Sequence, residues 1–279
     1  MLIVGSDPSL RQALDALVRE ARLVFFAGLP GTGKSLLIHQ LAHLAHEWQR
    51  RVHLLQWDVA RPLFEESRAG QRYPQHHGVT HGMIRIAVGC WARAAVSRWD
   101  HEHPRGDDLL IGETPFIGHR LIDLARRADD TAEAVLSAST TRFVIPVPSV
   151  ALRAHVEAER ARRAEKPLHP REREDAPPEV LRDLWRQVAT VAGVTPLDPP
   201  YDPATYRRVY EQLLVHRHAQ VLPIETRLPT DGFSAYDFRV PVTDIVPSEA
   251  EAAYSLAEVE AHFADPGAVE REIAGWSRV

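Results

Sequence analysis

The chain has 279 residues, of which 44% are hydrophobic and 25% charged, so it can bury a core without disulfides or a structural metal. A single cysteine, Cys90, excludes an intramolecular disulfide, and the lack of about 18 consecutive apolar residues excludes a membrane-spanning helix. The formal net charge of −5 argues against a general nucleic-acid coat and leaves room for a local basic pocket. These features predict a cytoplasmic protein without a membrane partner, and the N-terminal segment lacks the pattern of a secretion signal.

The first part of the chain alternates between helical and strand patterns. An amphipathic helix is predicted over residues 7–21. Residues 23–27 form an apolar run without alternation, which is typical of a buried parallel strand. Helical spacing resumes over 34–50, and a second strand is predicted over 52–57, with Asp58 directly after it. The residues of the second helix expected to face inward are Leu37, Leu41, Leu44 and Trp48.

Three further strands are predicted along the rest of the chain. A helix over 83–99 leads to a strand at 109–111, and a helix over 117–128 leads to a strand at 143–145. A fifth strand is predicted at 219–224. Strands separated by helices imply βαβ units, so the expected fold is α/β: a parallel sheet of about five strands with helices on both faces.

The composition changes after residue 150. Residues 151–200 contain charged helices and a proline-rich, charged stretch, and predict a lid-like insertion over the sheet edge; a solvated linker is the alternative. Residues 1–150 would then form the core, and residues 201–279 would supply its last strand and C-terminal helices. The helical ending is predicted from capping-box patterns, such as the one that begins at Ser248.

The strongest motif lies between the first strand and the second helix. It matches G-x-x-x-x-G-K-[ST], a loop whose backbone N–H groups surround phosphate groups. The helix that follows adds roughly half a positive charge at its N-terminus. One of the chain's two lysines lies here and would reach the β- and γ-phosphates, while the serine hydroxyl would bind Mg²⁺. The predicted cofactor-binding residues are Gly28, Pro30, Gly31, Thr32, Gly33, Lys34 and Ser35.

On this motif the core resembles the P-loop NTPase superfamily, over about residues 20–150. The resemblance implies a three-layer P-loop fold with ATP and Mg²⁺ as cofactors. The Asn-Lys-x-Asp motif of Ras-like GTPases is missing. The loop resembles that of AAA-type ATPases, but the third strand ends in Gly112-Glu113-Thr114 without their Asp-Glu pair.

The residues after the second strand favour a kinase. Asp58-Val59-Ala60-Arg61 resembles the Asp-x-x-Arg of adenylylsulfate kinases and of some nucleoside and antibiotic kinases. The resemblance implies that Asp58 orients the acceptor hydroxyl and that Arg61 binds an anionic group. The alternative is a strand-end aspartate that caps the next turn beside a surface arginine.

Two other sets of charged residues are candidates. Glu113 ends an apolar strand and would hold Mg²⁺ or position a nucleophile; a helix-capping role is the alternative. Arg160 and Arg163, three residues apart on a predicted helix, resemble the lid arginines that close over phosphates in P-loop kinases. A solvated helix with Glu–Arg pairs is the alternative for this pair.

These observations predict a Mg²⁺-ATP-dependent phosphotransferase that acts on a hydroxyl or phosphate of a small molecule or nucleotide. The predicted catalytic residues are Lys34, Asp58, Arg61, Arg160 and Arg163, and the predicted metal ligands are Ser35 and Glu113. Two alternatives are an AAA-like ATPase switch with a protein or nucleic-acid partner, and a kinase of nucleic-acid ends or tRNA. The sequence leaves the acceptor and the oligomeric state open.

Overall fold

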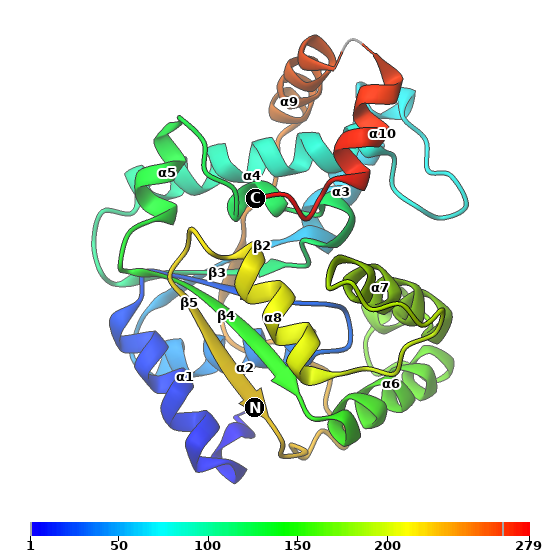
Figure 1. Cartoon of the computed structure of the whole chain (residues 1–279). Helices are drawn as coiled ribbons and strands as arrows, with labels where there is room; N and C mark the ends of the chain where they lie inside the picture. The colour runs from blue at the N-terminus through cyan, green and yellow to red at the C-terminus, as the bar shows by residue number, and fades with distance from the viewer. Residues whose placement is uncertain (1, 264) are drawn as a thin grey trace.

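The computed structural model describes residues 2–263 and 265–279 of the chain and contains one parallel sheet (Figure 1). Its strands run in the order β5-β4-β1-β3-β2-β6. The strands are β1 (Leu23–Ala27), β2 (Arg51–Gln56), β3 (Asp108–Thr114), β4 (Thr141–Pro148), β5 (Ala219–Ile224) and β6 (Val242–Asp244). The prediction of a parallel α/β sheet is confirmed, and the sixth strand, β6, is a short edge strand that the sequence analysis missed.

Helices lie on both faces of this sheet (Figure 1). They are α1 (Pro8–Glu20), α2 (Lys34–Glu47), α3 (Trp57–Glu66), α4 (Gly82–Glu102), α5 (Thr131–Leu136), α6 (Val150–Glu165), α7 (Pro178–Val191), α8 (Pro203–Leu213), α9 (Glu249–His262) and α10 (Pro266–Ala274). None of the helices in the described ranges is long and apolar enough to cross a membrane.

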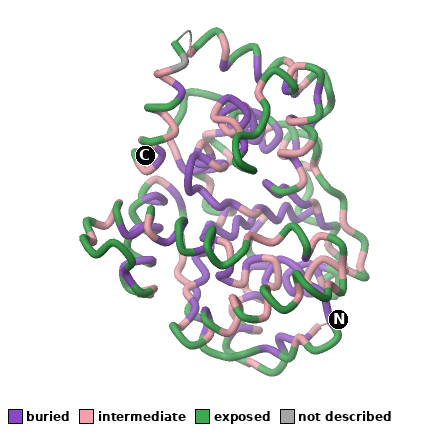
Figure 2. The backbone as a smooth tube through the Cα atoms, turned by 90° about the vertical axis from the view of Figure 1, so that its right-hand side faces the viewer, coloured by how far each residue is buried: buried purple, intermediate pink, exposed green. Residues whose placement is uncertain are grey.

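The sequence of β1 explains the two layers. All five of its residues are buried, and successive side chains point to opposite faces of the sheet. Leu23 and Phe25 join the core formed with α4 and α8, whereas Val24 and Phe26 join the core formed with α1 and α2. A strand covered on both faces therefore reads as a continuous apolar run. Figure 2 shows buried residues concentrated along these central strands.

The predicted helix boundaries hold well at α1 and α2. Asp7 caps α1 by accepting a hydrogen bond from the Leu10 amide at 3.0 Å. The expected core positions Leu37, Leu41 and Leu44 of α2 are buried, but Trp48 is 51% exposed. The prediction that Trp48 faces inward is wrong because α2 ends at Glu47, so the tryptophan lies on the C-cap rather than on the helical stripe.

Two predicted elements need correction. The second strand ends at Gln56 rather than Trp57, and helix α3 begins at once, so Asp58 lies in the first turn of that helix. The predicted helix over 117–128 is wrong: the segment holds only two short 3₁₀ turns, Ile117–His119 and Ile122–Leu124. Phe116, His119 and Leu121 have φ angles of 63°, 66° and 62°, a conformation that interrupts a right-handed helix.

Candidate functional site

The loop between β1 and α2 has the backbone that a phosphate-binding loop needs. Gly31 and Gly33 have φ angles of 80° and 86°, in the left-handed region that glycine adopts without a steric penalty. Gly33 is also the N-cap of α2, so the amides of the first turn of that helix open toward the loop. The loop thus presents backbone N–H groups and a helix N-terminus to one side.

Gly28 is required for a different reason. A Cβ atom at this position would lie 2.2 Å from the hydroxyl oxygen of Tyr206 on α8, which is closer than real contacts allow. The aromatic ring itself is farther away, with Cζ at 3.5 Å. The glycine therefore lets the loop rest directly on the buried Tyr206 side chain.

This contact yields a stability prediction. We expect Gly28→Ala to lower the free energy of unfolding by about 1–3 kcal/mol in urea titrations, because the new methyl group overpacks the site. Tyr206→Phe should recover part of that loss by removing the hydroxyl oxygen. Gly5→Ala is the matched control, since nothing lies within 4 Å of its added Cβ. If Gly28→Ala lowers the free energy of unfolding equally in the wild-type and the Tyr206→Phe backgrounds, the explanation is wrong.

Lys34 lies at the start of α2 and is buried, with 3% of its side chain exposed. Its Nζ donates a hydrogen bond to the Leu29 carbonyl oxygen at 2.8 Å and lies 3.2 Å from Oε1 of Glu113. Burial lowers the pKa of Lys34, and the negative charge of Glu113 opposes that shift. The ammonium group is thus held against the loop by one carbonyl and one carboxylate.

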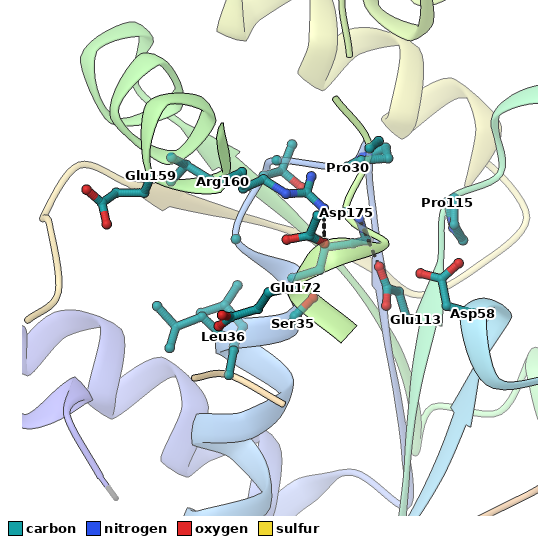
Figure 3. Close-up of a pocket in the computed structure, with 18 of the residues that line it drawn as sticks. Pro30, Ser35, Leu36, Asp58, Glu113, Pro115, Glu159, Arg160, Glu172 and Asp175 are labelled. Carbon is teal, nitrogen blue, oxygen red and sulfur yellow. Dashed lines mark hydrogen bonds and ion pairs between the residues drawn. The ribbon is translucent and has the colours of Figure 1, made fainter. Parts of the chain in front are cut away.

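Strand register brings a second carboxylate to the same place. Glu113 on β3 aligns with Phe26 of β1 and with Gln56 of β2, and Asp58 follows Gln56 by two residues. Figure 3 shows Asp58 and Glu113 next to one another beside the loop. The Asp58 carboxylate is open to a cavity but has protein on most sides. This desolvation, together with the charge of Glu113, raises the pKa of Asp58 to about 6.

The donor set fits a magnesium ion. The Ser35 hydroxyl and the Glu113 carboxylate line one cavity, and oxygen ligands of this kind suit Mg²⁺. The repulsion that raises the pKa of Asp58 also shows that two carboxylates are crowded here, and a divalent cation would relieve that crowding. Ser35 and Glu113 are therefore the residues that would hold the ion.

Helix α6 brings an arginine over the loop. Nη1 of Arg160 lies 3.8 Å from the position of a Cβ at Gly31, and this buried nitrogen has no hydrogen-bond partner among the described residues. Its other terminal nitrogen, Nη2, donates to Asp175, as the dashed line in Figure 3 marks. Tyr236 donates its hydroxyl to the same carboxylate at 2.9 Å. One end of the guanidinium is thus anchored, while the other faces the phosphate loop.

Arg163 also borders the cavity, but its guanidinium is engaged elsewhere. Nη1 donates to the Phe233 carbonyl at 2.8 Å and to Glu172 at 3.1 Å, and Nη2 donates to the Thr230 carbonyl at 2.9 Å. These bonds tie α6 to the segment that follows β5. They favour a tethering role over the predicted contact with a phosphate.

One cavity of about 540 Å³ joins these features. It contains most of the predicted site residues, brought together from separate elements: Pro30, Gly31, Thr32, Gly33, Lys34, Ser35, Asp58, Arg61, Glu113, Arg160 and Arg163. Gly28 is not among its lining residues, since it lies behind the loop against Tyr206. Helices α6 and α7 supply a cover, because Leu181 of α7 also lies 3.8 Å from the position of a Cβ at Gly31.

Several residues of this site were not predicted from the sequence. Asp175 binds Arg160, and Tyr236 donates to Asp175; both come from segments without a recognisable motif. Thr80 and Gln75 line the same cavity, come from the loop before α4 and donate hydrogen bonds to the Glu65 carboxylate. Arg120 does follow the Gly-Glu-Thr-Pro segment in the sequence, but its position depends on the irregular backbone at 116–121.

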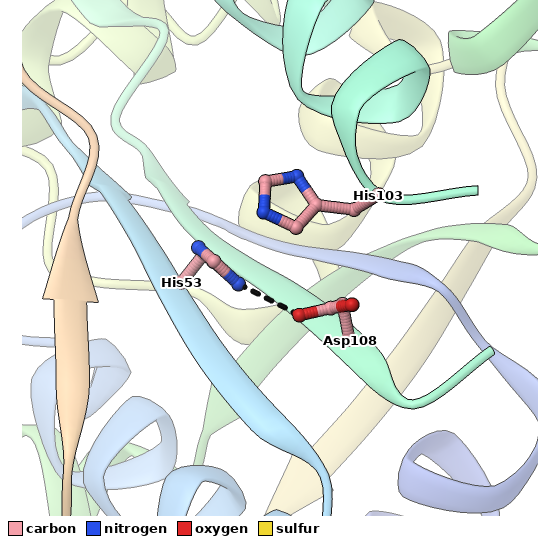
Figure 4. A group of neighbouring side chains, drawn as sticks. All are labelled: His53, His103 and Asp108. Atoms are coloured by element: carbon pink, nitrogen blue, oxygen red, sulfur yellow. Dashed lines mark hydrogen bonds and ion pairs between the residues drawn. The ribbon is translucent and has the colours of Figure 1, made fainter. Parts of the chain in front are cut away.

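A second group of titratable side chains lies at the opposite end of the strands. His53, His103 and Asp108 are close enough to hold a metal ion (Figure 4). However, Arg51 donates to both oxygens of Asp108, at 2.8 and 2.5 Å, and His53 lies 3.0 Å from one of them. Arg51 thereby holds the pKa of Asp108 at about 2. The carboxylate is already neutralised, so we interpret this group as a structural ion pair.

The structure is an α/β fold with a single parallel sheet, in which the G-x-x-x-x-G-K-[ST] loop joins β1 to α2. No family model matches the chain, and no curated protein is significantly similar to it in sequence. Among solved structures, Chaetomium thermophilum Kti12 in complex with ADP-AlF3 matches at 13% identity, over 86% of this chain and 97% of that chain, with a TM-score of 0.28. A likeness at this level is too weak to assign a fold or an activity.

Proposed function

We propose that the chain binds a nucleoside triphosphate with Mg²⁺ at the loop 28–35 and transfers its γ-phosphoryl group to a small molecule beside Asp58. The observation that carries the proposal is the shared cavity, which joins the phosphate loop to the Asp58 carboxylate under the cover of α6 and α7. A phosphotransferase needs two adjacent subsites, one for each reactant, within a space that excludes water. The Asp-x-x-Arg resemblance at Asp58 and Arg61 supports the assignment of the second subsite.

Each residue has a part in this mechanism. The loop amides and Lys34 would bind the phosphates, and Arg160 would neutralise charge that develops on the transferred group. Mg²⁺, when bound at Ser35 and Glu113, supplies neutralising charge on the phosphate oxygens. Asp58 would accept the proton of the acceptor hydroxyl as its oxygen bonds to the γ-phosphorus and the bond to the nucleoside diphosphate breaks.

The proposal is tested by incubating the purified chain with γ-labelled ATP and a mixture of metabolites. We expect the label to appear in an organic product that forms only when both reactants are present. Release of the label as inorganic phosphate alone, at the same rate with and without the mixture, would contradict phosphoryl transfer and favour an ATPase.

The two arginines of α6 provide a matched pair of variants. We expect Arg160→Gln to lower kcat by about tenfold or more, because it removes a charge-assisted contact worth about 1.5–3 kcal/mol. Arg163→Gln should instead lower the free energy of unfolding by about 1–3 kcal/mol, because buried Glu172 loses its cation. Turnover assays and urea titrations on both variants check the prediction. If Arg160→Gln instead lowers mainly the stability and Arg163→Gln mainly kcat, the two assigned roles are wrong.

A further inference from the structure

The charges around Asp58 do not balance. Lys34 is paired with Glu113 at 3.2 Å, and Arg61 is paired with Glu65 at 2.6 Å. Once these two pairs are set aside, one negative charge remains, on Asp58, and two positive charges remain, on Arg85 and Arg120. Neither of these arginines has an ion-pair partner within 4 Å among the described residues. The acceptor side of the cavity thus carries an excess of positive charge.

The two arginines lie close to each other. A Cβ atom at Gly118 would lie 3.2 Å from Nη1 of Arg120 and 3.3 Å from Nη1 of Arg85, so both guanidinium groups approach the same point. Gly118 has a φ of 60°, and its lack of a side chain leaves room for them. Arg85 donates to the carbonyls of Gly118 and Thr80, at 3.0 and 2.8 Å. Arg120 donates to the Ile117 carbonyl at 3.0 Å.

This arrangement favours the binding of an anion. Burial and the charge of Arg85 lower the pKa of Arg120 to about 10, and burial lowers the pKa of Arg85. A buried cation without a counter-ion destabilises a fold, whereas the same cation beside an oxyanion forms strong, charge-assisted hydrogen bonds. Arg120 lines the main cavity together with Thr80, Gln75 and Arg61, so its free donors are accessible from the acceptor side.

We propose that the acceptor is an oxyanion, a small molecule with a phosphate, sulfate or carboxylate group that binds to Arg120. Arg85 adds positive potential from behind Gly118, whereas Arg61 and the Thr80 hydroxyl are already bonded to the Glu65 carboxylate. The anionic group then anchors the acceptor while its reacting oxygen faces Asp58. This inference rests on the proposed function and narrows its substrate class.

The test is a titration of the full chain with inorganic phosphate, in which binding is measured by the shift of the thermal unfolding temperature. The protein is first saturated with Mg²⁺ and a non-hydrolysable ATP analogue, so that the loop and the γ-phosphate position are filled. We expect phosphate to stabilise this complex in a saturable way, and Arg120→Met to weaken phosphate binding about tenfold or more. Arg208→Met, at an exposed position of α8, should leave phosphate binding unchanged.

The same titration in the Lys34→Ala variant, without nucleotide, separates this inference from the proposed function. Phosphate binding that persists there and depends on Arg120 supports the anion subsite even if no nucleotide binds to the loop. Without phosphate, Arg120→Met should unfold at the same or a higher temperature than the wild type, because it removes an uncompensated charge. A lower unfolding temperature, with phosphate binding unchanged by Arg120→Met, would overturn the inference and make Arg120 a structural residue.

The acceptor pool gives an independent check. Anion-exchange resin divides the metabolite mixture of the labelling experiment into a retained, anionic fraction and a neutral or cationic one. The labelled product should form with the retained fraction. Product formation with the unretained fraction alone would contradict an anionic acceptor.

Discussion

Lys34→Ala should lower the turnover of ATP by on the order of a hundredfold or more, with the fold retained. The ammonium group is the cation that the loop places beside its own backbone amides, within 2.8 Å of the Leu29 carbonyl. Alanine keeps the helix propensity of the first turn of α2 while it removes this charge. Steady-state assays and far-UV circular dichroism check the two parts of the prediction.

The chain offers a matched control for this variant. Its other lysine, Lys166, is exposed after the end of α6, so Lys166→Ala removes the same group from a surface position. We expect wild-type turnover from the control. Unchanged turnover in Lys34→Ala would contradict the proposed role of the loop, and loss of the circular dichroism signal would make Lys34 a folding residue instead.

Asp58→Asn should lower kcat by about a hundredfold to ten-thousandfold, while the affinity for nucleotide changes little. Asparagine keeps the size of the side chain but cannot accept the proton of the acceptor. An equal loss of kcat and of nucleotide affinity would instead make Asp58 a metal ligand or a structural residue. Asp129→Asn, at an exposed position before α5, is the control.

The pH dependence provides a second readout of Asp58. Desolvation by the surrounding protein and the charge of the neighbouring Glu113 raise its pKa to about 6, so the carboxylate is mostly protonated below that pH and ionised above it. Only the ionised form accepts a proton. We therefore expect kcat to rise with pH and to level off near neutrality, with an inflection at or below about 6 because Mg²⁺ bound at Glu113 relieves part of the repulsion, and Asp58→Asn should lose this inflection. An inflection that persists in the variant would belong to another group.

The part of the site that was predicted best from the sequence is the part whose residues are consecutive in the chain. The phosphate loop, the apolar strand before it and the helix after it are consecutive, so motif and hydrophobic pattern identify them together. Glu113 could be assigned to the same cleft because carboxyl ends of parallel strands meet at one edge of a sheet. The predicted helix over 117–128 failed because its apolar residues suggest a helix, whereas the backbone at Phe116, His119 and Leu121 is left-handed.

The anion subsite lay beyond sequence analysis for a physical reason. The charge of an arginine is unpaired only when no acidic side chain lies next to it, and the tertiary structure decides which side chains lie there. Arg85 lies on α4 and Arg120 follows β3, and the turn at Gly118 brings them together. The role of Arg163 depends on tertiary structure in the same way, since its partners Thr230 and Phe233 lie 67 and 70 residues further along the chain.

Calorimetry with magnesium and ATP tests the central claim most directly. The account predicts saturable binding by the wild-type chain with one site per protein, and binding that is strongly weakened in Lys34→Ala. If the folded wild-type protein binds neither ATP nor GTP in the presence of Mg²⁺, the loop is not a nucleotide site and the proposed function is wrong.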